Sequence, residues 1–506
     1  MTMIIEYIYN EIKKEKYEMI NLMLGSLILA VWCVTLFFGK SIGLSMVLFA
    51  LPFTFFTIYL LEKNKKVVNK NAKILIIPII LLSVTYCLYN NSFFNTLNII
   101  VIPILTIIMV LDLLGEKFSL RFKLIEKVLT VIFESISFIG EDIEKIRQDI
   151  EEKLKINLDN EKSAKRKKIT QSILITLPIV LIVIMLLSSA DEIFGNVFIN
   201  IAEKISSFFK NIEISTIILK IILIAICSVY FLCFFDFITH RYEVDKQQEN
   251  KKSPKDDFTI KMILTALNAI YFVFCIIQIK SLFLKNVSIN YAEYARKGFF
   301  QLMIVSVINL VTILIAKNYN KNTNVKTKFI NLMSILMVLF TFIILMSSAY
   351  RMHLYESAYG YTMLRLLVYS SLFTESILLV PTIIYILDKP INLIKTYFTI
   401  VTVIYVCMNL ANFEKIIAKR NIDRYFETGK LDMYYLEYAT GSDAVEEIVR
   451  VLDRIDEEGN RIHAQRYLSE MYNELKNNKM DFRDYNYSKS RAKKIIENKL
   501  DKTNNI

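Results

Sequence analysis

The sequence predicts an all-α, polytopic integral membrane protein with about eleven transmembrane helices. Of its 506 residues, 54% are hydrophobic and the mean hydropathy is +0.41, whereas soluble domains hold about 45–50% apolar residues. The apolar residues stand in unbroken runs of about twenty, the length of helix that crosses roughly 30 Å of hydrocarbon. Only 11 Gly and 7 Pro are present. These observations exclude a soluble globular enzyme and a linker-rich or collagen-like protein.

Each predicted span is one uninterrupted apolar run. The runs are 19–38, 41–61, 74–89, 94–114, 169–189, 214–237, 262–283, 299–316, 329–347, 364–386 and 391–411. The first run follows a polar lead and ends in Trp32 and Phe38, without the small-residue pattern of a cleavage site. We therefore expect it to stay in the protein as a membrane anchor.

Lysine and arginine residues set the expected orientation, because short loops rich in them stay in the cytoplasm. With the N-terminus inside, the inner segments carry 32 Lys and Arg residues, and the short outer loops carry far fewer. The inner segments are 1–18, 62–73, 115–168, 238–261, 317–328 and 387–390. An odd number of spans then places the C-terminal tail outside. This asymmetry, together with attraction to anionic inner-leaflet lipids, explains the net charge of +12 without nucleic-acid binding.

The chain divides into four predicted parts. Residues 1–114 form an N-terminal four-helix membrane part, and residues 169–411 form a membrane core of about seven helices. Between them, 115–168 has apolar residues every third or fourth position among many charges, which predicts a cytoplasmic amphipathic helical segment. The tail 412–506 has 18 basic and 18 acidic residues and an Asp-Ala-Val-Glu capping box at 443–446. It is predicted to be an extramembrane helical module. Either extramembrane part could contact a protein partner.

Sequence signatures of catalysis and cofactor binding are absent. The sequence contains no glycine-rich phosphate loop, Walker lysine motif, GxSxG elbow, HExxH helix or CxxC pair. The six Cys lie inside apolar runs, and His240, His353 and His463 are too far apart in sequence for a zinc motif. We therefore expect no metal and no cofactor.

Two charged residues fall inside predicted spans, where burial in lipid is costly. Lys220 lies in the run 214–237, and Glu375 lies near the middle of 364–386. They could form a proton or cation site facing a cavity. They could equally form a structural ion pair or separate helix–helix hydrogen bonds, or Glu375 could stay protonated.

Three stretches expected at the outer face, 291–298, 351–365 and 421–436, are rich in Tyr, Arg and acidic residues. Interfacial Tyr and Arg usually anchor spans to lipid headgroups, and that interpretation stays open. Because all three stretches are expected on one face, they could instead form one shared polar site with buried Arg–carboxylate pairs. The candidate residues are Tyr291, Glu293, Tyr294, Arg296, Arg351, His353, Tyr355, Glu356, Arg365, Arg424 and Asp432.

The same stretches carry a family resemblance. They read YAEYARKGFFQL at 291–302, RMHLYESAYGYTMLR at 351–365 and NIDRYFETGKLDMYYLEYATGSDAV at 421–445. In this order they resemble the hallmark segments of a bacterial multi-pass membrane family, catalogued as domain of unknown function forty-one seventy-three, which has a close sister family. The resemblance covers about 165–450. It implies an integral membrane protein of the bacterial envelope, and it implies no activity and no functional residue. We expect this protein in the bacterial cytoplasmic membrane.

Three function classes remain. A scaffold, sensing or assembly component of the bacterial envelope is favoured by the two extramembrane helical parts and by the missing catalytic motifs. A small-solute or ion transporter could use Glu375 and Lys220. Against this class, the sequence shows no internal repeat, and its spans lack the Gly- or Pro-broken helices that are common at transporter sites. An intramembrane enzyme acting on a lipid-linked substrate could use Arg351, His353 and Glu356 together with Arg365.

The orientation can be tested by labelling in a Cys-free background. A cysteine that replaces Lys251, in the predicted inner segment 238–261, should resist a membrane-impermeant thiol reagent in intact cells and react after permeabilisation. Labelling of that cysteine in intact cells would overturn the proposed topology.

Overall fold

The structure is a computed structural model that describes residues 2–116, 123–137, 216–244, 257–283, 299–322, 328–477 and 481–504. Within these ranges the chain forms α-helices, a few 3-10 turns and one π-helical turn, with no strand. The predicted all-α class is therefore confirmed. The predicted run 169–189, most of the segment 115–168 and the stretch 291–298 lie outside the described residues.

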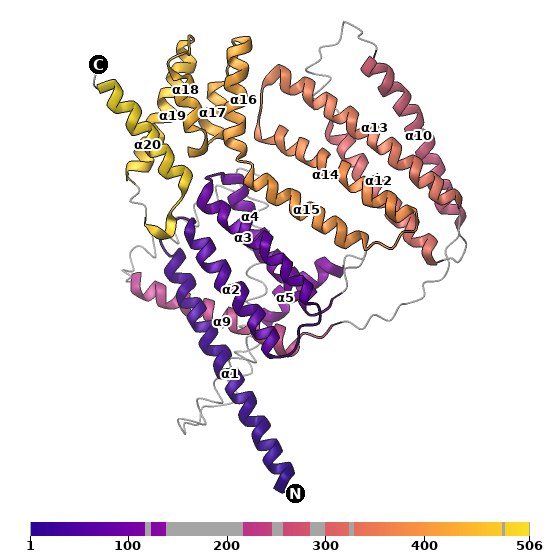
Figure 1. The fold of residues 1–506 in the computed structure, drawn as a ribbon, viewed down its shortest axis with the longest axis vertical. Coiled ribbons are helices and arrows are strands. Elements are labelled where there is room, and N and C mark those ends of the chain that lie inside the picture. Colours follow the sequence, from indigo (N-terminus) through magenta and orange to yellow (C-terminus); the bar gives the residue numbers. More distant parts are fainter. Residues whose placement is uncertain are drawn as a thin grey trace, which may run out of the picture. The chain divides into compact units, whose positions relative to one another are not determined.

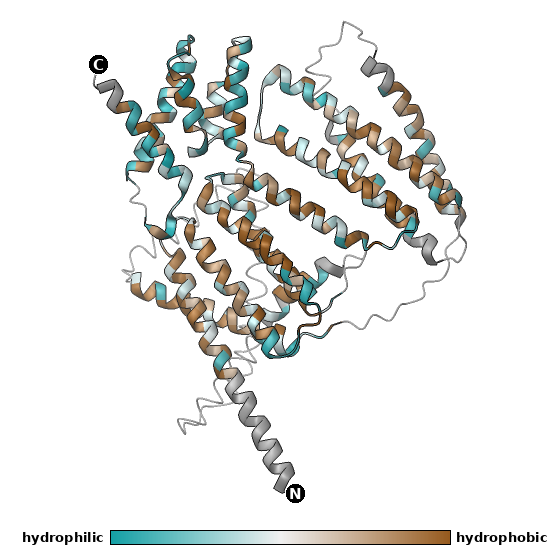
Figure 2. Cartoon of the chain, in the orientation of Figure 1, coloured by the Kyte–Doolittle hydropathy of each residue, from teal (hydrophilic) through white to brown (hydrophobic). Residues whose placement is uncertain are grey.

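Among the described residues, nine helices are long and apolar enough to cross a membrane. Figure 1 draws the described helices, and Figure 2 shows long stretches of apolar residues along many of them. Their apolar spans are Met19–Phe37 in α1 (Thr2–Phe37), Leu44–Lys63 (α2), Lys70–Leu88 (η1 and α3, Ile76–Leu88), Ser92–Leu113 (α4), Thr216–Arg241 (α9, Thr216–Asp236, and its π-helical end), Phe258–Gln278 in α10 (Asp257–Phe283), Lys328–Tyr359 (α13), Met363–Ile386 (α14) and Leu393–Leu410 (α15). The predicted run 299–316 corresponds to α12 (Phe299–Asn322), whose apolar part is shorter. A multi-pass membrane protein follows.

Helix α13 extends well beyond the predicted span 329–347. It continues to Tyr359 and so includes much of the motif 351–365, which we expected at the outer face beyond the end of that span. The polar residues of this extension can stay helical because they have partners on a neighbouring helix: Ser347 and Arg351 both donate to the Oε1 of Gln278 in α10, at 2.7 and 3.0 Å. Hydropathy counts the polar character of these residues but not the hydrogen-bond partners that they find on other helices. The predicted span therefore ended before the helix does.

The described chain forms two compact units. In the first unit, α1 packs against α2 and α9, and α5 (Lys123–Ser137) packs against α9. A cluster of aromatic rings from α2 and α9, which includes Phe53, Phe231 and Phe235, fills part of its interior. Lys220 belongs to this unit, where its ammonium lies 5.1 Å from the ring centroid of Phe38.

In the second unit, α13 packs against α10, α12 and α14, and α14 packs against α15 (Figure 1). Their shared core includes Leu264, Ile313, Met337 and Leu372. These helices are mostly apolar along their whole length, as expected of spans.

The tail folds as a separate helical layer of this second unit, which we call the module. It consists of α16 (Phe413–Thr428), α17 (Met433–Ala439), η3 (Ser442–Ala444), α18 (Val445–Leu452), α19 (Glu458–Asn477) and α20 (Tyr487–Asn504). The module has its own core, which includes Ile417, Leu436, Ile448, Tyr467 and Ile496. Hydrophilic residues are more frequent along the module than along the spans (Figure 2). The described part of the tail is therefore helical, and its predicted place outside the membrane stays a prediction.

Candidate functional site

The end of α13 carries a row of motif side chains. Arg351, Tyr355 and Tyr359 are four residues apart and so lie along one face of the helix. The Tyr355 and Tyr359 rings are 4.9 Å apart. Arg365, in the first turn of α14, lies over the Tyr355 ring at 4.4 Å from its centroid, and it donates to the carbonyl of Gly360. This stacking and hydrogen bonding hold a buried guanidinium at the turn between the two helices.

Gly360 closes α13 with a φ of +80°, the left-handed conformation that favours glycine after a helix. The side chain of Asn421, from α16, lies against this glycine, because an added Cβ would meet its Oδ1. That Oδ1 accepts a hydrogen bond from the Tyr361 amide at 2.9 Å, and the Asn421 Nδ2 donates to the Tyr361 carbonyl at 2.8 Å. One asparagine thus pairs with both backbone groups of a residue in the turn.

Two further module side chains bind the same turn. Arg424 donates from Nη2 to the carbonyl of Ala358 at 2.8 Å, and the Tyr435 hydroxyl accepts from the Met363 amide at 3.0 Å. We call this set of contacts the joint: residues 358–363 of the α13–α14 turn with Asn421, Arg424 and Tyr435 of the module. The second and third motifs therefore meet in the structure.

Buried Glu356 lies just before the turn. Its carboxylate is bonded to the hydroxyls of Tyr361 and Tyr369. Burial, with this carboxylate as the next cause, raises the pKa of Tyr361 to about 12. The phenol therefore stays protonated and keeps donating at neutral pH.

The remaining candidates have other surroundings. His353 is exposed on α13, and Asp432 caps α17 by accepting from the Tyr435 amide at 2.9 Å. Asp423 pairs with Arg450 of α18 at 2.7 Å. Tyr291, Glu293, Tyr294 and Arg296 lie outside the described residues. Arg365, Arg424 and Glu356 are thus held at the joint by backbone carbonyls, a tyrosine ring and tyrosine hydroxyls.

A second set of buried carboxyl groups fixes the loop between α3 and α4 to the module. Asp443 accepts from the Asn90 amide at 2.7 Å and from the Asn412 side chain at 3.3 Å. Glu414 accepts from the Gly441 amide at 2.7 Å and also from the backbone of Ser92. Sequence reasoning missed both carboxyl groups as site residues; the capping box had indicated Asp443 only as a helix start.

Burial dominates the titration of these two groups. Glu414 is only 6% exposed, and burial, reinforced by nearby Asp443, raises its pKa from 4.5 to about 8. Burial also raises the pKa of Asp443 above its ordinary value. Glu414 is therefore largely protonated at neutral pH.

Glu375 lies in a different place, within the membrane helices of the second unit. Its carboxylate accepts from Ser306 of α12. On neighbouring turns, Asn309 accepts from Tyr271 at 2.6 Å and donates to Thr341 at 3.0 Å. Hydrogen bonds of this kind allow polar groups to sit inside a membrane bundle. Lys220, its suggested partner, lies in the first unit beside Phe38.

Comparison with known proteins identifies a family and no activity. The model of a family described as "Domain of unknown function (DUF4153)" matches residues 76–451. No curated protein and no solved structure matches the chain. The expected resemblance to a membrane family of unknown function is confirmed. The matching family has the number 4153, whereas the motifs had suggested forty-one seventy-three.

The joint can be tested with a matched pair of glycine substitutions. Gly429→Ala and Gly360→Ala each force alanine into a left-handed conformation, which costs about 1–2 kcal/mol, but only at Gly360 does the new Cβ meet a neighbour. Gly360→Ala should therefore lower the free energy of unfolding by roughly 1–2 kcal/mol more than Gly429→Ala does, because the new methyl group displaces the Asn421 hydrogen bonds. Thermal unfolding of the purified full-length chain measures this. Equal losses in the two variants would argue against the joint.

The raised pKa of Glu414 predicts a pH-dependent stability. Unfolded glutamate titrates near 4.5 and folded Glu414 near 8, so the folded state loses stability as pH rises through this window, by about 3–5 kcal/mol in total. Glu414→Gln, which cannot ionise, should match the wild type near pH 5 and become more stable than it at pH 9. Melting temperatures at both pH values measure this, with exposed Glu427→Gln as the control. A constant difference between Glu414→Gln and the wild type would contradict the assignment.

Proposed function

The chain belongs to the DUF4153 family, and we propose that it is a membrane scaffold or sensing component, in which the membrane helices hold the helical module ready for a protein partner. The family description supplies no activity, so the proposal rests on the geometry of the second unit.

The joint is the observation that carries this proposal. A module attached only by a linker would need no hydrogen bonds to the spans. Here the side chains of Asn421, Arg424 and Tyr435 bind the backbone of the α13–α14 turn. A shift of the turn would break these bonds or carry the module with it. This coupling is what a scaffold or a sensor requires.

The module also presents a surface suited to a protein. Tyr434 and Tyr438 are each more than half exposed, their rings are 4.8 Å apart, and Tyr434 meets the His463 ring edge-on at 5.5 Å. His463 is in turn bonded to buried Glu437. We call these three rings the tyrosine patch. Exposed tyrosines held in place by neighbours are typical of protein interfaces.

The same contacts support the proposed orientation. The Lys and Arg asymmetry expects the α3–α4 loop, the α13–α14 turn and the tail on the outer face of a bacterial cytoplasmic membrane. Within the second unit, the loop binds the module through Asn90 and Asp443, and the turn binds it through Tyr361 and Asn421. Segments that touch in this way lie on one face, as the proposed orientation requires.

The two other function classes have weaker support. An enzyme would need free polar groups at the motif, whereas Arg365 and Glu356 are committed to the turn and to tyrosine hydroxyls. A transporter would use Glu375, whose described environment is a set of helix–helix hydrogen bonds.

In-cell photocrosslinking tests the scaffold proposal. Benzoylphenylalanine in place of Tyr434 or Tyr438 should give a discrete adduct with a protein, because a partner covers the tyrosine patch. The same probe at Phe426, an exposed ring on α16, serves as the control and should not give that adduct. Asn421→Ala should weaken the adduct by loosening the joint.

Two results would contradict the scaffold. Adducts with lipid alone at Tyr434 and Tyr438 would assign these rings to an interfacial belt. Cation or proton flux into proteoliposomes that Glu375→Gln abolishes and Asn421→Ala preserves would identify a transporter.

A further inference from the structure

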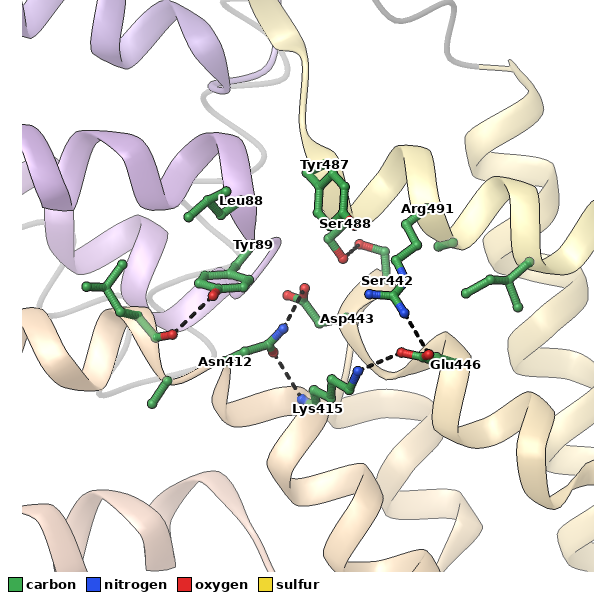
Figure 3. A pocket seen from close by; sticks show the side chains of 14 residues that line it. Leu88, Tyr89, Asn412, Lys415, Ser442, Asp443, Glu446, Tyr487, Ser488 and Arg491 are labelled. Carbon is green, nitrogen blue, oxygen red and sulfur yellow. Dashed lines mark hydrogen bonds and ion pairs between the residues drawn. The ribbon is translucent and has the colours of Figure 1, made fainter.

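A pocket of about 320 Å³ opens between the ends of two spans and helices α16, α18 and α20 of the module (Figure 3). Leu88 and Leu410, at the ends of the two spans, form an apolar part of its lining. Lys415, Glu446 and Arg491 form a charged wall. All lining residues belong to the second unit.

Three charged side chains form the polar wall. Glu446 accepts from Lys415 at 2.6 Å through one oxygen and from Arg491 at 2.7 Å through the other (Figure 3). The hydrogen bond from Lys415 and, to a smaller extent, the charge of Arg491 hold the pKa of Glu446 below its ordinary value. The side chains of Lys415, Glu446 and Arg491 are 35%, 40% and 45% exposed, and such surface ion pairs contribute little stability. An incoming ligand can therefore exchange with them at low cost.

Asp443 belongs to the interior of the same pocket and is already committed. It accepts from the Asn90 amide and the Asn412 side chain, while Ser442 and Ser488 bond to each other at 3.0 Å. The groups available for exchange are therefore Lys415, Arg491 and Glu446.

The pocket lies beside the ends of two apolar spans. Leu88 is the last residue of the α3 span, and Leu410 is the last residue of the α15 span. A molecule that fills the pocket would have an apolar part against these leucines and a polar part against the charged wall. Membrane lipids have this division.

We propose that the pocket binds an aminophospholipid, with its phosphate between Lys415 and Arg491 and its ammonium at Glu446. A phosphate that takes the two cations from Glu446 leaves that carboxylate without its partners, which is unfavourable. A primary ammonium on the same headgroup restores a partner, so charges balance before and after exchange. An anionic lipid without an amine would leave Glu446 unpaired.

Lipid binding to the detergent-purified full-length chain tests this inference, by native mass spectrometry and by the shift in melting temperature. Dihexanoylphosphatidylethanolamine should bind, and Arg491→Gln should weaken its binding about tenfold by removing a charge-assisted contact. Arg450→Gln is the matched control: Arg450 also pairs with an acid at 2.7 Å, its side chain is 42% exposed against 45% for Arg491, and it does not line this pocket. It should leave binding unchanged.

A second variant and three further probes complete the test. Ala411→Phe adds a ring at an exposed pocket residue in ordinary helical geometry and should also weaken binding. Dihexanoylphosphatidylglycerol, glycerophosphoethanolamine and inorganic phosphate should each bind more weakly, because they lack the amine, the acyl chains or both. Equal binding by phosphatidylglycerol, equal binding by a chainless probe, or no effect of either pocket variant would overturn the proposal. These outcomes are independent of whether a protein covers the tyrosine patch.

Discussion

The pairing of the Asn421 side chain with the backbone of Tyr361 is the contact on which the second unit depends. A helix end leaves backbone groups without partners, and near a membrane water replaces them poorly. Here α13 ends and α14 begins within a few residues, at a glycine with φ +80°. An asparagine offers a donor and an acceptor on one short side chain. It can therefore satisfy this tight turn and join it to α16 at once.

The module is held on the spans by both apolar and polar contacts. Met363 and Leu366 of α14 pack against its apolar core, while Asn421, Asp443 and Glu414 reach the turn and the α3–α4 loop through hydrogen bonds. Such contacts are directional, so they define one position for the module. They also make that position sensitive to charge, because ionising Glu414 would bury a carboxylate beside Asp443. An attachment whose stability depends on pH agrees with the proposed sensing role.

Sequence reasoning predicted the spans and the helical tail because both depend on patterns along a single helix. Apolar run length locates α2 or α14 without knowledge of any partner. It could not predict the continuation of α13, since Arg351 is tolerated through Gln278, 73 positions away. Nor could it pair Asn90 with Asp443, which are 353 positions apart. Charge complementarity suggested acidic partners for motif arginines, whereas Arg424 and Arg365 donate to carbonyls exposed by the end of α13. Those carbonyls become available only once the helix ends are in place.

The hydrogen bonds among the membrane helices also favour a scaffold over a transporter. A transporter must move its midplane groups between two environments. Glu375 is instead bonded to Ser306, and Asn309 bridges Tyr271 and Thr341. These three bonds join α12 to α10, α13 and α14, so a large motion of α12 relative to the other helices would break all of them within the apolar bundle, where replacement partners are scarce. Near the C-terminal end of α14, buried Lys317 of α12 donates to the Ile386 carbonyl and pairs with Asp388. Bonds at two levels restrain the bundle, and a restrained bundle is what a fixed module requires.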